Sequence, residues 1–139
     1  MPKIYRSMKQ AEDGKPVVEA SAKGLGVRVT GVRDVDLDDQ GNVVLDGKGM
    51  SVAPELSKLL PHLIPRRLRH RFPKAAESPG LYCFTMGVGS FSNGPMTDDL
   101  ELQVDSPSHG VVAPRHLVPL DRYQADLAST RDAWTVDES

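Results

Sequence analysis

The sequence has few of the residues that build disulfide-bonded or metal-stabilised proteins. Its 139 residues include one cysteine, Cys83, and four histidines scattered along the chain. One cysteine forms no internal disulfide, and the Cys and His residues lack the spacing of a zinc site. We therefore expect a reducing compartment and no bound metal.

Long apolar runs and an excess of one charge are also missing. No window approaches the ~18 to 20 apolar residues that cross a bilayer, and the polar beginning of the chain lacks the apolar core of a secretory signal. Seventeen basic and nineteen acidic residues give a net charge of −2, which disfavours general coating of nucleic acid. These features predict a cytoplasmic protein with no membrane contact, or one delivered to another cell without a cleaved signal.

The residues that are present predict a single domain, residues 1–139, rich in strands. A chain of this length buries roughly two-thirds of the surface that it exposes when unfolded, which suits one core. Alternating or continuous apolar patterns predict strands, and an Asp- and Gly-containing turn separates two further strand-like pieces. The predicted strands are Lys3–Met8, Leu81–Met86, Leu100–Val104 and Gly110–Ala113, and the turn is Asp38–Asn42.

Helices are predicted in two places only. Pro54 suits the first turn of a short helix that runs through Leu60 and stops at Pro61. The prolines that follow exclude a long helix, so the middle of the chain is expected to be an ordered loop with one or two helical turns. Asp121 is expected to cap a convincing helix over RYQADLASTRDAW. The pattern as a whole predicts an α+β fold with mostly antiparallel strands, few short helices and a C-terminal helix.

Three local motifs come close to known sites and fail at a decisive position. The acidic run Asp34–Asp39 lacks the glycine and the glutamate of a calcium loop. Gly87 and Gly89 lack a third glycine that would serve a dinucleotide-binding turn, and are expected to permit a bend between strands. Ser51 is not in the nucleophile elbow of a serine hydrolase.

Three other features each allow two interpretations. Arg6 is either an exposed strand residue or a ligand-binding one. His109, at the start of a strand, is either a surface residue or a polar group aimed into a cleft. The basic segment Arg66–Lys74 is either a solvated loop or a surface that docks an acidic partner.

Several segments, taken in order, carry a resemblance that extends over nearly the whole chain. They are IYRSM, DGKP, GKGMSVAP, IPRRL and DSPSHGVVAPRHLVPLDRYQADLASTRDAW. This series resembles the ADP-ribosyltransferase-like toxins typified by a small type VI secretion effector that acts in the cytoplasm. The resemblance implies a split, mostly antiparallel sheet, with NAD as the substrate in a cleft between its halves. It also implies a macromolecular acceptor and a cognate antitoxin or immunity protein.

The resemblance also implies roles for individual residues. Arg6 matches the arginine of the first strand, Ser51 matches the serine of a middle strand, and His109 stands where related transferases carry a glutamate. Glu101 or Glu138 replaces that glutamate only if the fold brings one of them into the cleft. Cleavage of the nicotinamide–ribose bond needs a fixed dinucleotide and stabilisation of a developing cation. The expected site is catalytic Arg6, Ser51 and His109, with Tyr5, Arg6, Ser51, Tyr82 and Phe91 binding NAD.

Two alternatives remain at this point. One is an NAD-hydrolysing toxin of the Arg-Glu-Ser domain type, with its glutamate and serine drawn from Glu55, Glu77 or Glu101 and from Ser106 or Ser108. The other is a non-catalytic binding protein that docks through residues 66–74. The transferase interpretation makes a geometric prediction: Arg6 and His109 lie on opposite walls of one cleft, with Ser51 between them and an aromatic ring nearby.

Overall fold

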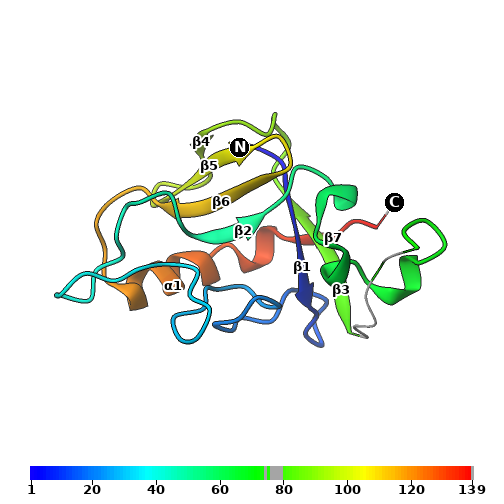
Figure 1. Ribbon diagram of the computed structural model, residues 1–139, viewed down its shortest axis with the longest axis horizontal. Coiled ribbons are helices and arrows are strands. Elements are labelled where there is room, and N and C mark those ends of the chain that lie inside the picture. The colour runs from blue at the N-terminus through cyan, green and yellow to red at the C-terminus, as the bar shows by residue number, and fades with distance from the viewer. Residues whose placement is uncertain (74, 76–79, 139) are drawn as a thin grey trace.

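The protein has an α+β fold with two mostly antiparallel sheets and one α-helix near the C-terminus (Figure 1). The computed structural model describes residues 1–73, 75 and 80–138. The predicted fold class and the predominance of antiparallel pairing are confirmed. Within the described residues, no helix is both long enough and apolar enough to cross a membrane.

The first sheet has the strand order β1-β3-β7, with antiparallel pairing throughout. Its members are β1 (Ile4–Lys9), β3 (Leu81–Met86) and β7 (Thr135–Val136). Ile4, Arg6 and Met8 alternate along one face of β1, and Ile4 and Met8 belong to the main apolar core. The side chain of Arg6 therefore starts on the core face of its strand.

The second sheet has the order β2-β6-β5-β4, again antiparallel throughout. Its members are β2 (Met50–Val52), β4 (Gly94–Pro95), β5 (Leu100–Ser106) and β6 (His109–Pro114). The register between β5 and β6 shifts between Val104 and Ser106, just before the tight turn that leads into His109. This irregular turn brings the beginning of β6 close to β2.

The two sheets meet at one bridge between β1 and the residue that follows β2. The N–H of Tyr5 donates to the carbonyl of Ala53 at 2.8 Å, and the N–H of Ala53 donates to the carbonyl of Tyr5 at 2.9 Å. The bridge is isolated, so it does not extend into a ladder. Continued pairing in this register would place Ser7 opposite Ser51, and these two residues instead line an opening between the sheets.

Helix α1 (Leu120–Ala128) packs against the second sheet through Tyr123 and Leu127, which are fully buried. The Tyr123 hydroxyl donates to the carbonyl of Val112 and accepts the N–H of Met50 at 3.1 Å. One phenol group thus fixes the separation of β2, β6 and the helix, and burial raises its pKa.

The start of α1 differs from the sequence prediction. The helix begins at Leu120, and Pro119 occupies the N-cap position without a side-chain cap. Asp121 lies inside the first turn, where its carboxylate accepts the N–H of Arg122 at 2.9 Å. A carboxylate at this place still interacts favourably with the positive end of the helix dipole. The helix also ends at Ala128, and a separate 3-10 turn, η4 (Arg131–Ala133), leads to the buried Trp134.

The middle of the chain is an ordered loop with short helical turns, as expected, but the turn within Pro54–Leu60 is shorter than the predicted helix. It is the 3-10 turn η1 (Leu56–Lys58), and two more turns follow, η2 (Pro61–Leu63) and η3 (Arg66–Leu68). Pro61 begins the second turn rather than ending a helix. Proline has no N–H to donate and it restricts the preceding residue, so closely spaced prolines divide the segment into single turns.

The turn predicted at Asp38–Asn42 forms, but the strands predicted around it do not. The N–H of Asp38 donates to the carbonyl of Asn42 at 2.9 Å, and the flanking residues share only the isolated Leu37–Val43 bridge. The N–H of Val43 donates to the carbonyl of Val118 at 2.8 Å. The outer edge of this short hairpin is therefore bonded to a distant loop rather than to another strand.

Candidate functional site

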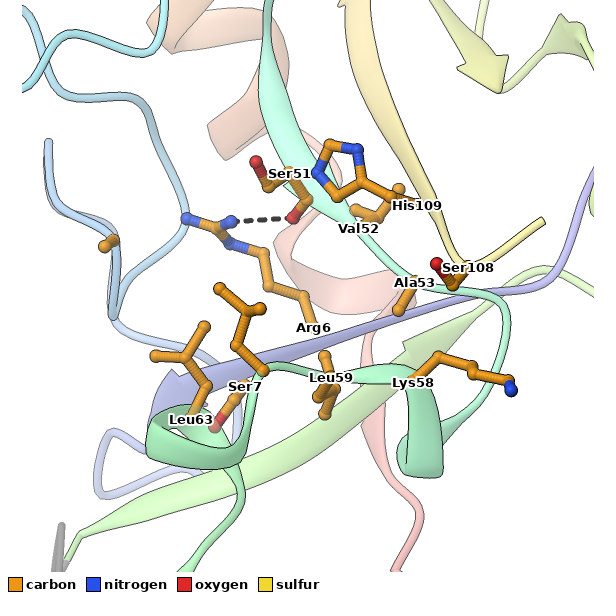
Figure 2. Close-up of a pocket in the computed structure, with 12 residues that line it drawn as sticks. Arg6, Ser7, Ser51, Val52, Ala53, Lys58, Leu59, Leu63, Ser108 and His109 are labelled. Carbon is orange, nitrogen blue, oxygen red and sulfur yellow. Dashed lines mark hydrogen bonds between the residues drawn. The ribbon is translucent and has the colours of Figure 1, made fainter. Parts of the chain in front are cut away.

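A pocket of about 260 Å³ occupies the opening between the sheets (Figure 2). Its polar lining comes from three distant parts of the chain, namely β1, the β2 segment with the turn that follows it, and the beginning of β6. The structure therefore brings Arg6, Ser51 and His109 to one pocket. The polar residues that line it are Arg6, Ser7, Ser51, Lys58, Ser108 and His109.

The rest of the pocket lining is aliphatic. Val52 and Ala53 contribute from the β2 segment, and η1 and η2 add Leu59, Leu60 and Leu63. The described residues that line the pocket include no aspartate and no glutamate. The pocket thus combines an aliphatic surface with two cationic side chains, a combination that suits an anion carrying a flat apolar group.

Arg6 is buried, with 6% of its surface exposed, and its guanidinium is held by main-chain carbonyls. Nη1 donates to Ser51 at 2.8 Å, while Nε and Nη2 donate to Gly24 at 3.1 and 3.0 Å. Further bonds from Nη2 reach Ser21 at 3.2 Å and Gly26 at 3.3 Å. The side chain is therefore a rigid tie between β1, the 21–26 loop and β2, rather than an exposed strand residue.

The charge of Arg6 has no carboxylate in contact with it among the described residues. Burial lowers the pKa of Arg6 to about 10, and the charge of Asp34 opposes this shift from a distance. Asp34 itself pairs with Arg28 at 2.9 Å. Arg6 therefore remains a cation at neutral pH, balanced mainly by carbonyl dipoles, so the adjoining pocket has a positive potential that attracts anions.

Ser7, beside Arg6, is 1% exposed and is one of the residues that line the pocket. Along β1, alternate residues direct their main-chain groups to opposite edges. Tyr5 and Lys9 bond on the edge away from β3, to Ala53 and Lys23 respectively. The N–H and C=O of Ser7 face this same edge and have no partner among the described residues, and the Ser7 Oγ is also unpaired. Buried polar groups normally have partners, so these three indicate a binding position.

His109 lies at the mouth of the pocket, with 43% of its side chain exposed. Its Nδ1 is 2.9 Å from both carboxylate oxygens of Asp105, four residues earlier across the β5–β6 turn. Figure 2 shows the other ring nitrogen on the side of Ser51, whose carbonyl is bonded to Arg6. Ser51 thus lies between Arg6 and His109, in the order that the transferase interpretation expects.

The aromatic residues expected to bind NAD lie outside the lining of this pocket. The Tyr5 hydroxyl donates to Asp137 at 3.0 Å, and the Tyr82 ring lies 4.1 Å from the guanidinium carbon of Arg67. Phe91 packs against the main core. A ligand ring in the pocket would contact leucines rather than stack on an aromatic side chain.

The candidate glutamates are not among the lining residues either. Glu55 lies exposed at the start of η1. Glu101 belongs to β5, opposite Ala113 of β6, and β6 separates it from β2. Glu138 accepts hydrogen bonds from Arg67. Glu77 lies outside the described residues. Of the two candidate serines of the Arg-Glu-Ser alternative, Ser108 lines the pocket and Ser106 does not.

Much of the basic segment is engaged within the protein. Arg67 pairs with Glu138 and donates to a main-chain carbonyl at 2.8 Å. Arg69 and Arg71 also donate to carbonyls, at 3.0 and 2.7 Å. Lys74 lies outside the described residues. Arg67 and Arg71 thus hold Glu138 of the C-terminal segment near β3, whereas Arg69 bonds to Ala75 within its own loop.

Sequence reasoning missed Ser7, Lys58 and Asp105. Lys58 and Ser7 gain their importance from contacts between distant segments, which a local pattern does not reveal. Asp105 carried a usable signal, since it stands four residues before His109 across the short Ser-Pro-Ser turn. Among the described residues, no group of three or more Asp, Glu, His or Cys side chains is placed to hold a metal ion.

Comparisons of the chain with protein-family models, with curated proteins and with solved structures found no match, so the assignment of function depends on the geometry of this pocket.

Proposed function

We propose that the protein is an ADP-ribosyltransferase-like toxin domain that binds NAD in the pocket between its sheets and transfers ADP-ribose to a cellular acceptor. The observation that carries the proposal is the buried, unpaired edge of Ser7 beside the charged Arg6. The pocket thus offers hydrogen-bonding groups for a carboxamide and a positive charge for an anionic part of the same ligand.

The unpaired main-chain N–H and C=O of Ser7 suit the carboxamide of nicotinamide. A carboxamide holds an N–H donor and a C=O acceptor in one plane, as a residue of a neighbouring strand does. Its oxygen would accept the N–H of Ser7, and its nitrogen would donate to the carbonyl of Ser7. The nicotinamide ring would then lie against Leu59 and Leu63 of the aliphatic lining.

The cations suit the pyrophosphate of NAD. Arg6 gives the inner part of the pocket a positive potential, and the exposed Lys58 at its rim directs its ammonium outward, away from Arg6 (Figure 2). A volume of about 260 Å³ is small for a whole dinucleotide. The nicotinamide–ribose end would fill the pocket, and the remainder of NAD would extend outward past Lys58.

The toxic activity and the cognate antitoxin rest on the resemblance of the sequence. An enzyme that consumes or attaches a central cofactor must be silenced in the cell that produces it. We therefore expect a partner that covers the pocket mouth, where Ser108 and His109 lie.

Calorimetric titration with NAD tests the binding step, and incubation with labelled NAD and a cell lysate tests the reaction. We expect saturable binding, release of nicotinamide and transfer of label to macromolecules. Release of nicotinamide without labelled macromolecules would favour the NAD-hydrolysing alternative. Absence of both binding and release would reject the proposal.

A set of small competitors tests the assigned carboxamide position. Nicotinamide and benzamide share the amide, whereas nicotinic acid presents two acceptor oxygens to the Ser7 carbonyl. We expect the two amides to displace NAD and the acid to compete at least about tenfold more weakly, the cost of one unpaired buried polar group. Equal competition by the acid would contradict this orientation.

A charge reversal separates the enzyme from the docking alternative. Arg66 is exposed in η3 and does not line the pocket. We expect Arg66→Glu to leave NAD binding unchanged and Lys58→Glu to weaken it. The reverse result would favour a protein that acts through its basic segment.

A further inference from the structure

We infer that His109 and Asp105 form a proton-accepting pair that activates a hydroxyl acceptor for attack on the bound nucleotide. The inference rests on the proposed function and extends it to the second substrate. His109 is the catalytic residue of the pair, since it lines the pocket. Asp105 is a positioning residue, since it acts through the imidazole.

The geometry of the pair fixes which nitrogen is available. Both carboxylate oxygens of Asp105 lie 2.9 Å from Nδ1 of His109. A carboxylate accepts only, so Nδ1 carries the proton and Nε2 of the neutral ring keeps its lone pair. Figure 2 shows this nitrogen directed toward Ser51 rather than away from the pocket. A base at the mouth meets an acceptor that arrives from solvent.

The surroundings of His109 suit a base that acts at the mouth of the pocket. Arg6 and Lys58 line the same pocket and are cations, so neither can accept the proton. Asp105, on the opposite side of the ring, stabilises the imidazolium once it has formed. The described lining residues include no carboxylate, so among them His109 is the residue suited to act as the general base.

The step balances without another reactant. The bond between the ribose C1′ and the nicotinamide nitrogen breaks, and its electron pair leaves with nicotinamide, which becomes neutral. The acceptor oxygen forms a bond to C1′, and its proton moves to Nε2 of His109. The imidazolium then loses this proton to solvent. The acceptor class is therefore an alcohol, or water when no alcohol is bound.

Four variants test the roles by the rate of nicotinamide release and by NAD affinity, measured separately. We expect His109→Gln to lower the rate about 100-fold and Asp105→Asn about tenfold or more, while the dissociation constant for NAD changes less than about threefold. Asp105→Glu should recover part of the rate. His116→Gln, a change at an exposed histidine outside the pocket, should have no effect.

A further readout separates catalysis from a loss of structure. Nitrogen-15 NMR of the neutral His109 ring should show the proton on Nδ1 in the wild type, and a loss of that preference in Asp105→Asn. Asp39→Asn, at an exposed position, serves as the control.

The outcomes distinguish the two proposals. If the wild type binds NAD and releases nicotinamide but Asp105→Asn keeps its full rate and its tautomer, the proton-accepting pair is wrong and the NAD site stands. If the wild type neither binds NAD nor releases nicotinamide, the proposed function is wrong, and the inference falls with it.

Discussion

At the scale of single residues, Arg6 combines a structural and a functional task. Its guanidinium bonds to carbonyls of the 21–26 loop and of Ser51, so one side chain holds three segments at the base of the pocket. Its charge faces the same pocket without a contacting carboxylate among the described residues. A planar guanidinium has the donor number and spacing for both tasks, whereas an ammonium group does not.

Replacement of Arg6 should therefore cost stability as well as binding. Arg6→Lys keeps the charge but leaves buried carbonyls of Gly24 and Ser51 without donors, so we expect a loss of about 3 kcal/mol in the free energy of unfolding. Urea denaturation measures it. Arg33→Lys, at an exposed position, should change stability by less than about 0.5 kcal/mol. Equal effects of the two changes would show that the carbonyl contacts contribute little.

The single thiol reports on the opening of the first sheet. Cys83 is fully buried on β3, and burial raises its pKa to about 12. The reactive thiolate is therefore scarce at pH 8. We expect negligible reaction of the folded protein with a thiol reagent such as dithionitrobenzoate, and complete reaction in urea. Fast labelling of the folded protein would mean that β3 separates readily from its neighbours.

At the scale of elements, a glycine determines how β3 leaves its sheet. Gly87 follows β3 with a φ of +87°, and a β-carbon there would lie 1.9 Å from the carbonyl oxygen of Pro2. The sequence predicted that Gly87 permits a bend between strands, and the positive φ agrees with this. The close approach to the residue before β1 was beyond a local pattern, because it joins segments that are far apart in the chain.

A matched pair of substitutions separates the two costs at Gly87. Gly41 also has a positive φ, +80°, but a β-carbon there would meet no atom within 4 Å. We expect Gly41→Ala to cost about 1 kcal/mol for the left-handed conformation alone. Gly87→Ala should cost at least about 1 kcal/mol more, because main-chain atoms must also move. Similar melting temperatures for the two variants would contradict this.

The elements also show where sequence reasoning succeeded and where it stopped. Apolar periodicity located β1, β3, β5, β6 and the start of α1 closely, because alternation and helical spacing are local properties, whereas the predicted helix continued to Trp134 and α1 ends at Ala128. The 3-10 turns replaced a predicted helix where prolines removed donors. The unpaired main-chain groups of Ser7 were not predictable from the sequence. They are left without partners because the bridge between Tyr5 and Ala53, which joins distant segments, does not continue to Ser7.

At the scale of the whole molecule, ion pairs distributed over the surface set the response to acid. Hydrogen bonds hold the pKa below its ordinary value for Asp13, Glu19 and Asp36, chiefly from Arg131, Ser21 and Lys48 respectively. A carboxylate whose pKa is lowered on folding adds stability above its unfolded pKa, and this stability is lost as the pH falls through the folded value.

We therefore expect a stability plateau above about pH 5 and a progressive loss below about pH 4. Urea midpoints between pH 3 and pH 7 would measure this. Asp36→Asn should lower the plateau slightly and reduce the slope below pH 4, since Lys48 loses its charged partner. The effect is small because both side chains are partly exposed to solvent. An unchanged slope would mean that this pair forms equally in the unfolded chain.

The isolated bridge between Tyr5 and Ala53 has a consequence for the motion of the two sheets. It supplies the main-chain hydrogen bonds that join β1 to the β2 segment among the described residues, and the side-chain bond from Arg6 to Ser51 links the same two strands. A molecule bonded to both Ser7 and Ser51 would add a further link between the two sheets. Slower hydrogen–deuterium exchange at these two amides, spreading toward Tyr5 and Ala53, would then record occupancy even where no product is formed.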